Sequence, residues 1–491
     1  MNEQLPTKET RRAASAAFIA AMLLVLVLVN VIINALAARY SWYLYTEEQY
    51  EHTIGDAANA VLGTAPEGET VRVLFCMAED AMEADVVYAL VLNTFRQLAE
   101  RYDFIKIEFV NIYLHPEEVA PFRSRTTEAG ETVESPISEQ CVILVSGEDE
   151  SKFRVELLQS FFVLDGEQAI TAYNGEEIAI SAVAWVLSDS HPVAGFTMGH
   201  GENQSNLLAF YTTLVASGYD IMLLDLNEDI PNGVELIVIA NPQWDFLRGA
   251  EGSGVIAELD RLEAFLAGGG TLFVSLDPYA KAPLNGLRGF LAERGLAATQ
   301  DVIHDSQNSI TTDGYTLVTE FASSEFGTAI VDRLGEFSDA RAIVREASVL
   351  ELSSVGSYTA TSILLSSPSS QSYQNGELKS DAGSFPVLAV AEAPLADGKS
   401  ATVFLASSVY FLANDVMNSA IYANRDVVLA SMEAASGNPA PVGCRVLSID
   451  NSRLEDLTMG TARLYTLLVA VAVPLAVSAV GVFVVVRRKI R

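Results

Sequence analysis

Residues 196–203 read FTMGHGEN, which places a histidine and a glutamate, His200 and Glu202, two positions apart between glycines. An imidazole beside a carboxylate can exchange a proton with a substrate, and the same two groups are common metal ligands. The chain has only 5 His and 3 Cys among 491 residues, so a larger site of these residue types has few further members. Catalysis, ligand binding and the capping of a turn are the roles open to this pair.

The local pattern favours a capped turn over a reactive site. Gly199 and Gly201 allow positive φ, and Glu202 precedes an expected helix, where its side chain can accept hydrogen bonds from free N–H groups. A catalytic pair would need a nucleophile, but no G-x-S-x-G elbow occurs. Neither H-x-x-x-H, C-x-x-C nor H-E-x-x-H occurs either, so we expect no metal site and no cofactor.

Two other dipeptides end apolar strands in the same region, Asn241-Pro242 and Asp277-Pro278. Because the carboxyl ends of parallel strands meet at one edge of a sheet, we expect these segments and GHGE to line one crevice. We predict no catalytic residue in that crevice. The candidates for binding a ligand or partner are Gly199, His200, Gly201, Glu202, Asn241, Pro242, Asp277 and Pro278.

The run GGGTLFVSLDP, residues 268–278, is not a phosphate-binding loop. In a Walker loop the glycines follow a strand and lead into Lys-Ser/Thr, whereas here they precede the strand and no lysine follows them. The glycines therefore predict the end of a helix.

The elements that carry these motifs predict an α/β protein. Residues 191–294 alternate apolar strands with helices, the pattern of a parallel sheet covered on both faces. Residues 305–380 lack clear periodicity and suggest an insertion or a β-rich elaboration. Residues 71–165 read strand, helix, strand and then two further strands, which is typical of a small thioredoxin-like domain. The helix expected within 166–190 would connect the two units.

The cysteines indicate no redox chemistry. Cys76 follows the first strand of the small domain without a second cysteine nearby, so the C-x-x-C of a working thioredoxin is missing. Cys76 and Cys141 lie in apolar runs, and Cys444 is far away in the sequence. We expect buried, inert thiols from this spacing.

Two uncharged runs, 16–38 and 464–486, predict membrane-spanning helices. Basic residues precede the first run and follow the second. This distribution places both termini in the cytoplasm and the domain between them outside the plasma membrane. The alternative for the first run is a cleaved signal peptide, since Ala35-Leu36-Ala37 fits a cleavage site. The formal net charge of −33 excludes nucleic acid as a partner and predicts a well-solvated acidic surface.

The order of motifs resembles the GldG-like auxiliary components of ABC transporters, first recognised in gliding motility. The similar segments lie between residues 165 and 435 and include GHGE, DIPNGVELIVIANP, LDRLEAFLAGGGTLFVSLDP and NRDVVLASM. The resemblance implies a glutamine-amidotransferase-like fold and two partners, an ABC ATPase subunit and a polytopic permease subunit. Where an amidotransferase carries its nucleophilic cysteine, this chain offers Asn241 and Pro242, which implies binding without the chemistry.

We therefore predict a non-catalytic auxiliary membrane component of an ABC-type transport system, with an extracytoplasmic domain that binds substrate or an envelope partner. The alternatives are a surface sensor or adhesin without a transporter, and a membrane-anchored hydrolase using His200 and Glu202. The sequence specifies neither the substrate, nor the direction of transport, nor the oligomeric state. The predicted order is a cytoplasmic N-terminus (1–15), a transmembrane helix (16–38), a membrane-proximal lead-in (39–70), the thioredoxin-like subdomain (71–165), the amidotransferase-like domain (166–435) with its insertion (305–380), a linker (436–463), a second transmembrane helix (464–486) and a basic cytoplasmic tail (487–491).

Overall fold

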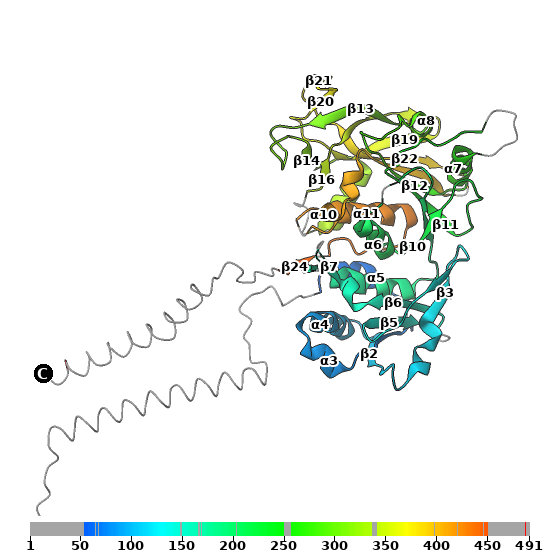
Figure 1. The fold of residues 1–491 in the computed structure, drawn as a ribbon, viewed down its shortest axis with the longest axis vertical. Helices are drawn as coiled ribbons and strands as arrows, with labels where there is room; N and C mark the ends of the chain where they lie inside the picture. Colours follow the sequence, from blue (N-terminus) through cyan, green and yellow to red (C-terminus); the bar gives the residue numbers. More distant parts are fainter. Residues whose placement is uncertain are drawn as a thin grey trace, which may run out of the picture. The chain divides into compact units, whose positions relative to one another are not determined.

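The computed structural model describes residue 487 and residues 54–449 without positions 64, 67, 148–149, 165–166, 168, 203, 250–256, 336–340, 397, 420 and 445. The described residues from 54 to 449 belong to one compact unit. The described part is a mixed α/β structure with a small and a large β-sheet, as the sequence predicts at this level (Figure 1).

The predicted membrane location needs correction. Among the residues that the structure describes, no helix combines the length and the apolar composition that a bilayer crossing requires. For that part of the chain the prediction of a membrane protein with an external domain is wrong. The two runs on which it was based, 16–38 and 464–486, lie outside the described residues.

The small sheet has the strand order β2-β1-β5-β6. Strands β1 and β2 are parallel and are connected through helix α4, while β5 and β6 are antiparallel additions. The side chain of Asp85 caps α4 by accepting hydrogen bonds from the N–H groups of Val87 and Tyr88, at 2.8 and 3.2 Å. The bounds are β1 (Val71–Phe75), α3 (Glu79–Ala84), α4 (Val86–Arg101), β2 (Ile105–Phe109), β5 (Cys141–Ser146) and β6 (Lys152–Leu157).

The large sheet has nine strands, and its main path is β10-β9-β11-β12-β23-β22-β19-β15. From β10 to β23 neighbouring strands are parallel, whereas β22, β19 and β15 each run antiparallel to their neighbour on the path. The bounds are β9 (Val193–Thr197), β10 (Asp220–Leu224), β11 (Val234–Ala240), β12 (Thr271–Ser275), β15 (Glu320–Phe321), β18 (Ser354–Val355), β19 (Tyr358–Leu365), β22 (Pro386–Pro394) and β23 (Ser400–Ala406).

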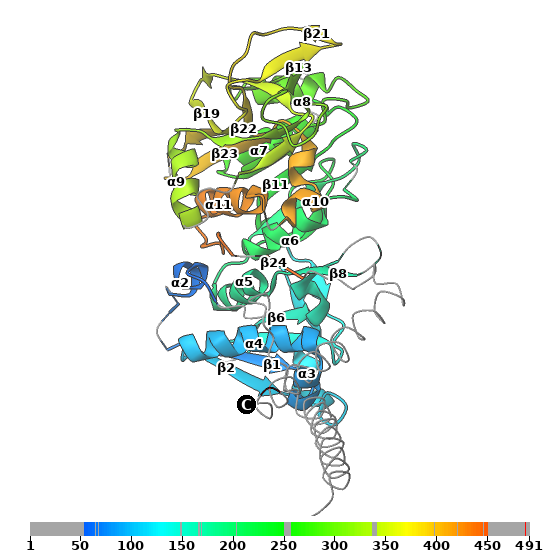
Figure 2. The same ribbon diagram turned by 90° about the vertical axis from the view of Figure 1, so that its left-hand side faces the viewer.

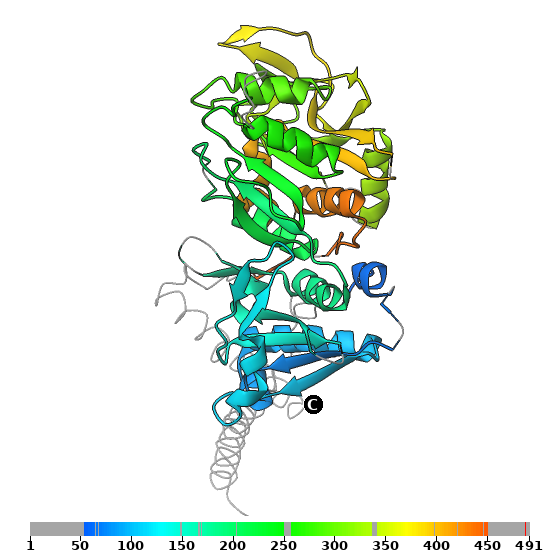
Figure 3. The same cartoon turned by 90° about the vertical axis from the view of Figure 1, so that its right-hand side faces the viewer.

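Helices cover both faces of the large sheet, which confirms the prediction for residues 191–294. One face packs against α6, α9 and α11 around Phe210, Ile330 and Val428 (Figure 2). The other face packs against α7 and α8 through Leu262 and Leu287, seen as green helices over the strands in Figure 3. Near-continuous apolar strands result because both faces are buried. The bounds are α6 (Leu208–Ala216), α7 (Glu258–Ala267), α8 (Asn285–Ala292), α9 (Glu325–Leu334), α10 (Asn414–Met417) and α11 (Asn424–Ser436).

Residues 305–380 are rich in β-structure, in agreement with the second of the two interpretations of that segment. They supply strands to the large sheet and to smaller sheets. A buried carboxylate fixes this region, because Asp305 accepts hydrogen bonds from the hydroxyls of Ser367, Ser369 and Ser370. Burial alone would raise the pKa of Asp305, but these bonds and two backbone N–H donors lower it to about 2. The smaller sheets contain β14 (Thr316–Val318), β16 (Ile343–Arg345), β17 (Ser348–Leu352), β20 (Gln371–Gln374) and β21 (Glu377–Leu378) from this segment, and β13 (Leu296–His304) from just before it.

Helix α5 (Gly175–Leu187) connects the two sheets along the chain. Its apolar side chains, among them Ile180 and Val183, belong to the core of the small sheet. Its Glu177 carboxylate forms an ion pair with Arg425 of α11, and the two side chains are 2% and 7% exposed. The other short elements are α2 (Ala57–Leu62), β3 (Ser124–Thr126), β4 (Thr132–Glu134), β7 (Phe162–Leu164), β8 (Ile170–Tyr173) and β24 (Leu447–Ser448).

Candidate functional site

The three predicted segments lie at one edge of the large sheet. Strands β9, β11 and β12 are adjacent and parallel, and they end at Thr197, Ala240 and Ser275. GHGE, Asn241-Pro242 and Asp277-Pro278 follow directly after these ends, so all eight candidate residues belong to the carboxyl edge. We use the name carboxyl edge for these three strand ends and the loops that follow them.

His200 is buried in a cluster of charged side chains. Its side chain is 7% exposed, and its Nε2 lies 3.0 Å from Oε1 of Glu258, the first residue of α7. Its Nδ1 lies 3.5 Å from Oε1 of Glu202, an ion-pair distance without hydrogen-bond geometry. The ring stacks on Phe246, with centroids 3.7 Å apart and planes 14° from parallel. A substrate therefore has no open path to either ring nitrogen.

Glu202 closes the turn, but it does not cap the following helix, because α6 begins only at Leu208. Its carboxylate accepts hydrogen bonds from the backbone N–H of His200 at 2.8 Å and from the hydroxyl of Thr197 at 3.1 Å. Gly199 and Gly201 have φ values of 103° and 72°, so the positions that favour glycine are used for that purpose. The turn is held by its own polar side chains.

The charges in this cluster stabilise one another. Burial disfavours a charged imidazole and is the largest single influence on His200, but the carboxylates of Glu202 and Glu258 together outweigh it and raise the pKa of His200. Burial would likewise raise the pKa of Glu202, yet its bonds to His200 and to the turn lower it. The fold therefore favours the charged form of both His200 and Glu202.

Glu258 is a member of the cluster that sequence reasoning missed. It begins α7, and its second oxygen accepts a hydrogen bond from the N–H of Leu247 at 2.8 Å. An acidic residue in the first turn of a helix normally indicates interaction with the helix dipole. Its position in the helix that follows the neighbouring strand was the signal, because that helix must start at the same edge as GHGE.

Asn241 joins the first two segments. It has a positive φ of 55°, which is uncommon for a residue other than glycine. Its Oδ1 accepts a hydrogen bond from Nε2 of Gln243 at 2.7 Å. The backbone N–H groups of Gln243 and Trp244 donate to the carbonyl of His200 at 2.8 and 2.9 Å. The chain after Pro242 is thus tied to GHGE by the backbone.

Asp277 and Pro278 lie beside these two segments. The Asp277 carboxylate accepts a hydrogen bond from the N–H of Tyr279 at 2.8 Å. The backbone N–H of Lys281 donates to Oε1 of Gln243 at 3.3 Å, which links this loop to the one after β11. Burial, and next the charge of Asp277, raise the pKa of Glu346, so an acidic region adjoins the loop.

Large apolar side chains point outward from the same loops. Met198, Trp244, Leu247 and Tyr279 are 46%, 54%, 69% and 60% exposed. Trp244 lies against Gly201, where a Cβ would come within 2.9 Å of its Nε1. The carboxyl edge therefore buries its charges and exposes apolar surface, the arrangement expected of a protein contact.

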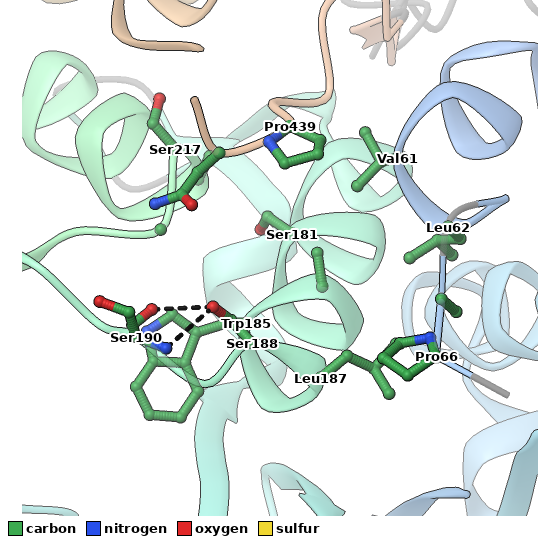
Figure 4. A pocket seen from close by; sticks show the side chains of 15 residues that line it. Val61, Leu62, Pro66, Ser181, Trp185, Leu187, Ser188, Ser190, Ser217 and Pro439 are labelled. Carbon is green, nitrogen blue, oxygen red and sulfur yellow. Dashed lines mark hydrogen bonds between the residues drawn. The ribbon is translucent and has the colours of Figure 1, made fainter. Parts of the chain in front are cut away.

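Two cavities in the described residues lie elsewhere, and none of the eight candidate residues lines either of them. The smaller, about 180 Å³, lies between α2, α5 and the end of α6, with Leu62, Trp185 and Pro439 in its wall (Figure 4). The larger, about 880 Å³, lies where β11, β12 and β23 begin. No single crevice lined by all three predicted segments is found among these cavities.

The cysteines are free thiols. Cys76, directly after β1, and Cys141, the first residue of the neighbouring strand β5, are both buried, and burial raises the pKa of Cys76 to about 12. Cys444 is partly exposed and also unbridged. In the described part of the chain, no three His, Cys, Asp or Glu side chains are grouped so that they could hold a metal ion.

Comparison with known proteins gives little. No protein-family model matches the chain, and no curated protein matches it. Among solved structures, the mmIFT52 N-terminal domain is 14% identical with a TM-score of 0.38, and the alignment covers 50% of this chain and 97% of that chain. The cytoplasmic protein STM3548 from Salmonella typhimurium is 13% identical with a TM-score of 0.29, and the alignment covers 50% of this chain and 98% of that chain. A ThuA-like protein from Parabacteroides merdae is 10% identical with a TM-score of 0.30, and the alignment covers 52% of this chain and 97% of that chain. TM-scores this low carry no argument about function.

Proposed function

We propose that this chain is a non-catalytic auxiliary component of an ABC-type transport system and that the carboxyl edge of its large sheet binds a partner subunit. The partners would be a separate ATPase subunit and a permease subunit. The proposal rests on the GldG-like order of motifs together with the character of the carboxyl edge. From the order of strands and helices we infer that the small sheet is thioredoxin-like. From the GldG-like resemblance we infer that the large sheet is related to glutamine amidotransferases.

One observation carries the binding role. His200, the residue best suited to catalysis, has a carboxylate near each ring nitrogen and a phenyl ring against its face, while four large apolar side chains of the same edge are exposed. A general base needs access to the proton that it removes. Exposed apolar and aromatic side chains are instead the usual anchors of protein interfaces.

The end of β11 supports the same proposal. Asn241 and Pro242 stand where the amidotransferase resemblance would place a cysteine nucleophile. The Asn241 side chain is engaged with Gln243, and proline has no side-chain nucleophile. The hydrolase alternative would then depend on His200 and Glu202. The His200 ring, however, lies between the carboxylates of Glu202 and Glu258.

The test is affinity purification of the tagged chain from its native cells, with the double variant Trp244→Ala/Leu247→Ala beside it. We expect the unaltered chain to recover an ATP-hydrolysing subunit and the double variant to lose it. Leu378→Ala, which removes a side chain 51% exposed on β21, is the matched control and should keep the subunit. Equal recovery with all three chains would refute binding at the carboxyl edge. A hydrolytic activity lost in a folded His200→Gln variant would refute the non-catalytic role.

A further inference from the structure

The larger cavity lies at the edge of the large sheet where the parallel strands begin, opposite to the carboxyl edge. It is about 880 Å³, a volume within the range of small-ligand pockets. Its wall consists of the first residues of β11, β12 and β23, the last turns of α7 and α11, and the loop 229–233. Since helices in this arrangement run opposite to the strands, the ends of α7 and α11 meet the beginnings of the strands here. We call this cavity the amino-edge groove.

A row of polar side chains crosses the floor of the groove. Thr271, Thr402 and Glu392 are in register on the neighbouring strands β12, β23 and β22. Side chains in register on adjacent strands project to the same face of a sheet. All three line the groove, so its floor combines two hydroxyls with one carboxylate.

The charges around the groove are unbalanced toward the negative. Asp229, Glu235 and Glu392 line it, opposed by Arg261 and Lys399. Arg261 lies beside Asp229, with 3.7 Å between Nε and Oδ1. Burial and then the like charge of Glu325 raise the pKa of Glu392. Burial and then Glu128 raise the pKa of Glu235, against a smaller opposing effect of Lys399. A further positive charge would therefore stabilise both glutamates.

Two helix ends add to this preference. The last residues of α7 and α11, including Ala264 and Ser436, line the groove, and the carboxyl end of a helix carries partial negative charge. Carboxylates and helix ends therefore both favour a positively charged ligand.

We propose that the amino-edge groove binds a small organic polyamine, with one ammonium group at Glu392 on β22 and another at Glu235 on β11, two strands that are separated in the sheet by β12 and β23. Thr271 and Thr402 supply hydroxyls beside Glu392 for the polar remainder of the ligand. Lys399 competes with the ligand for Glu235, so it limits the affinity. This site is separate from the carboxyl edge and does not depend on the function proposed for that edge.

Spermidine binding to the full 491-residue chain, measured by calorimetry at fixed ionic strength, tests the proposal. We expect one site per chain. Glu392→Gln and Glu235→Gln should each weaken it by about tenfold, the usual scale for losing a charge-assisted hydrogen bond. Lys399→Met keeps the packed stem of the side chain and removes its charge, so it should strengthen binding. Glu351→Gln, an exposed carboxylate on β17 outside the groove, should leave it unchanged.

The variants distinguish a site from general attraction to an acidic protein. If spermidine fails to bind, or if Glu351→Gln weakens binding as much as Glu392→Gln does, the proposal is overturned. It is also overturned if Lys399→Met does not strengthen binding. Near-ultraviolet circular dichroism checks folding, and the Lys399→Met result decides the question even if a glutamate variant is misfolded.

Discussion

The two edges of the large sheet use polar residues in opposite ways. At the carboxyl edge, His200 lies between Glu202 and Glu258, and the loops are tied together by backbone hydrogen bonds. At the amino edge, Glu235 and Glu392 face a cavity of about 880 Å³. The most site-like motif, GHGE, lies where polar side chains bond to one another, whereas the cavity of about 880 Å³ lies where the sequence analysis predicts no binding residue. A conspicuous sequence motif therefore does not mark the place where a ligand has room to bind.

The largest effect expected from this comparison is on stability. His200→Ala leaves the carboxylates of Glu202 and Glu258 buried without the imidazole between them, their side chains being 4% and 8% exposed. Removing one partner of a buried ion pair costs about 3 to 5 kcal/mol. Urea unfolding should show that loss. A stability within about 1 kcal/mol of the unaltered chain would mean that the cluster is not structural.

The next effect concerns the turn itself. Gly201→Ala places a Cβ at a φ of 72°, within 2.9 Å of Trp244 Nε1. We expect a loss of about 1 to 3 kcal/mol, from strain in the left-handed region. The fluorescence of Trp244 should shift as the indole moves, and a Trp244→Phe background identifies its share of the signal. Gly398→Ala, at a φ of 83° with open space around it, separates backbone strain from the displacement of the indole.

A smaller effect is the pH dependence of stability. The raised pKa of His200 means that its stabilisation is complete below the unfolded value of about 6.5 and is lost as the pH rises through the folded pKa. The lowered pKa of Glu202 means that its contribution is complete above about 4.3 and is lost as the pH falls through its folded pKa. The stability difference between the chain and His200→Gln should therefore be greatest between about pH 4.3 and 6.5. A difference that is constant from pH 4 to 9 would contradict the charged cluster.

The smallest effect is expected at the amino edge. Glu392→Gln removes a carboxylate whose pKa is raised, which means that folding disfavours its charge. We expect the free energy of unfolding at pH 7 to change by less than about 0.5 kcal/mol, or to rise slightly. Urea unfolding beside His200→Ala makes the comparison direct. A loss as large as that of His200→Ala would show that Glu392 also serves the fold.

Much of the secondary structure could be predicted from the sequence. The glycine run 268–270 ends α7, and the apolar strands on either side of it are buried on both faces. These features depend on neighbours in the chain and on hydrophobic periodicity, so a single sequence contains them. The grouping of the three strand ends at one edge also followed, because parallel strands must end together.

The membrane prediction and the detail of the site fared differently. The uncharged runs that suggested membrane helices fall outside the described residues, and the part that is described contains no helix able to span a bilayer. The two cavities described above are not lined by the predicted segments, and Gln243, Trp244 and Lys281 bond the loops of the edge to one another. Those bonds depend on how loops distant in sequence approach, which no local pattern encodes.

The sequence by itself determined the alternation of strands and helices, the capped turn at GHGE and the strongly negative charge, since each follows from residue type and short-range spacing. Only the tertiary structure decided that Glu258 of another helix pairs with His200, and that Glu235 and Glu392 share one groove. The physical reason is that charge pairing and cavities arise between side chains brought together by packing. Their separation in the chain, 58 residues for the first pair and 157 for the second, leaves no trace in periodicity.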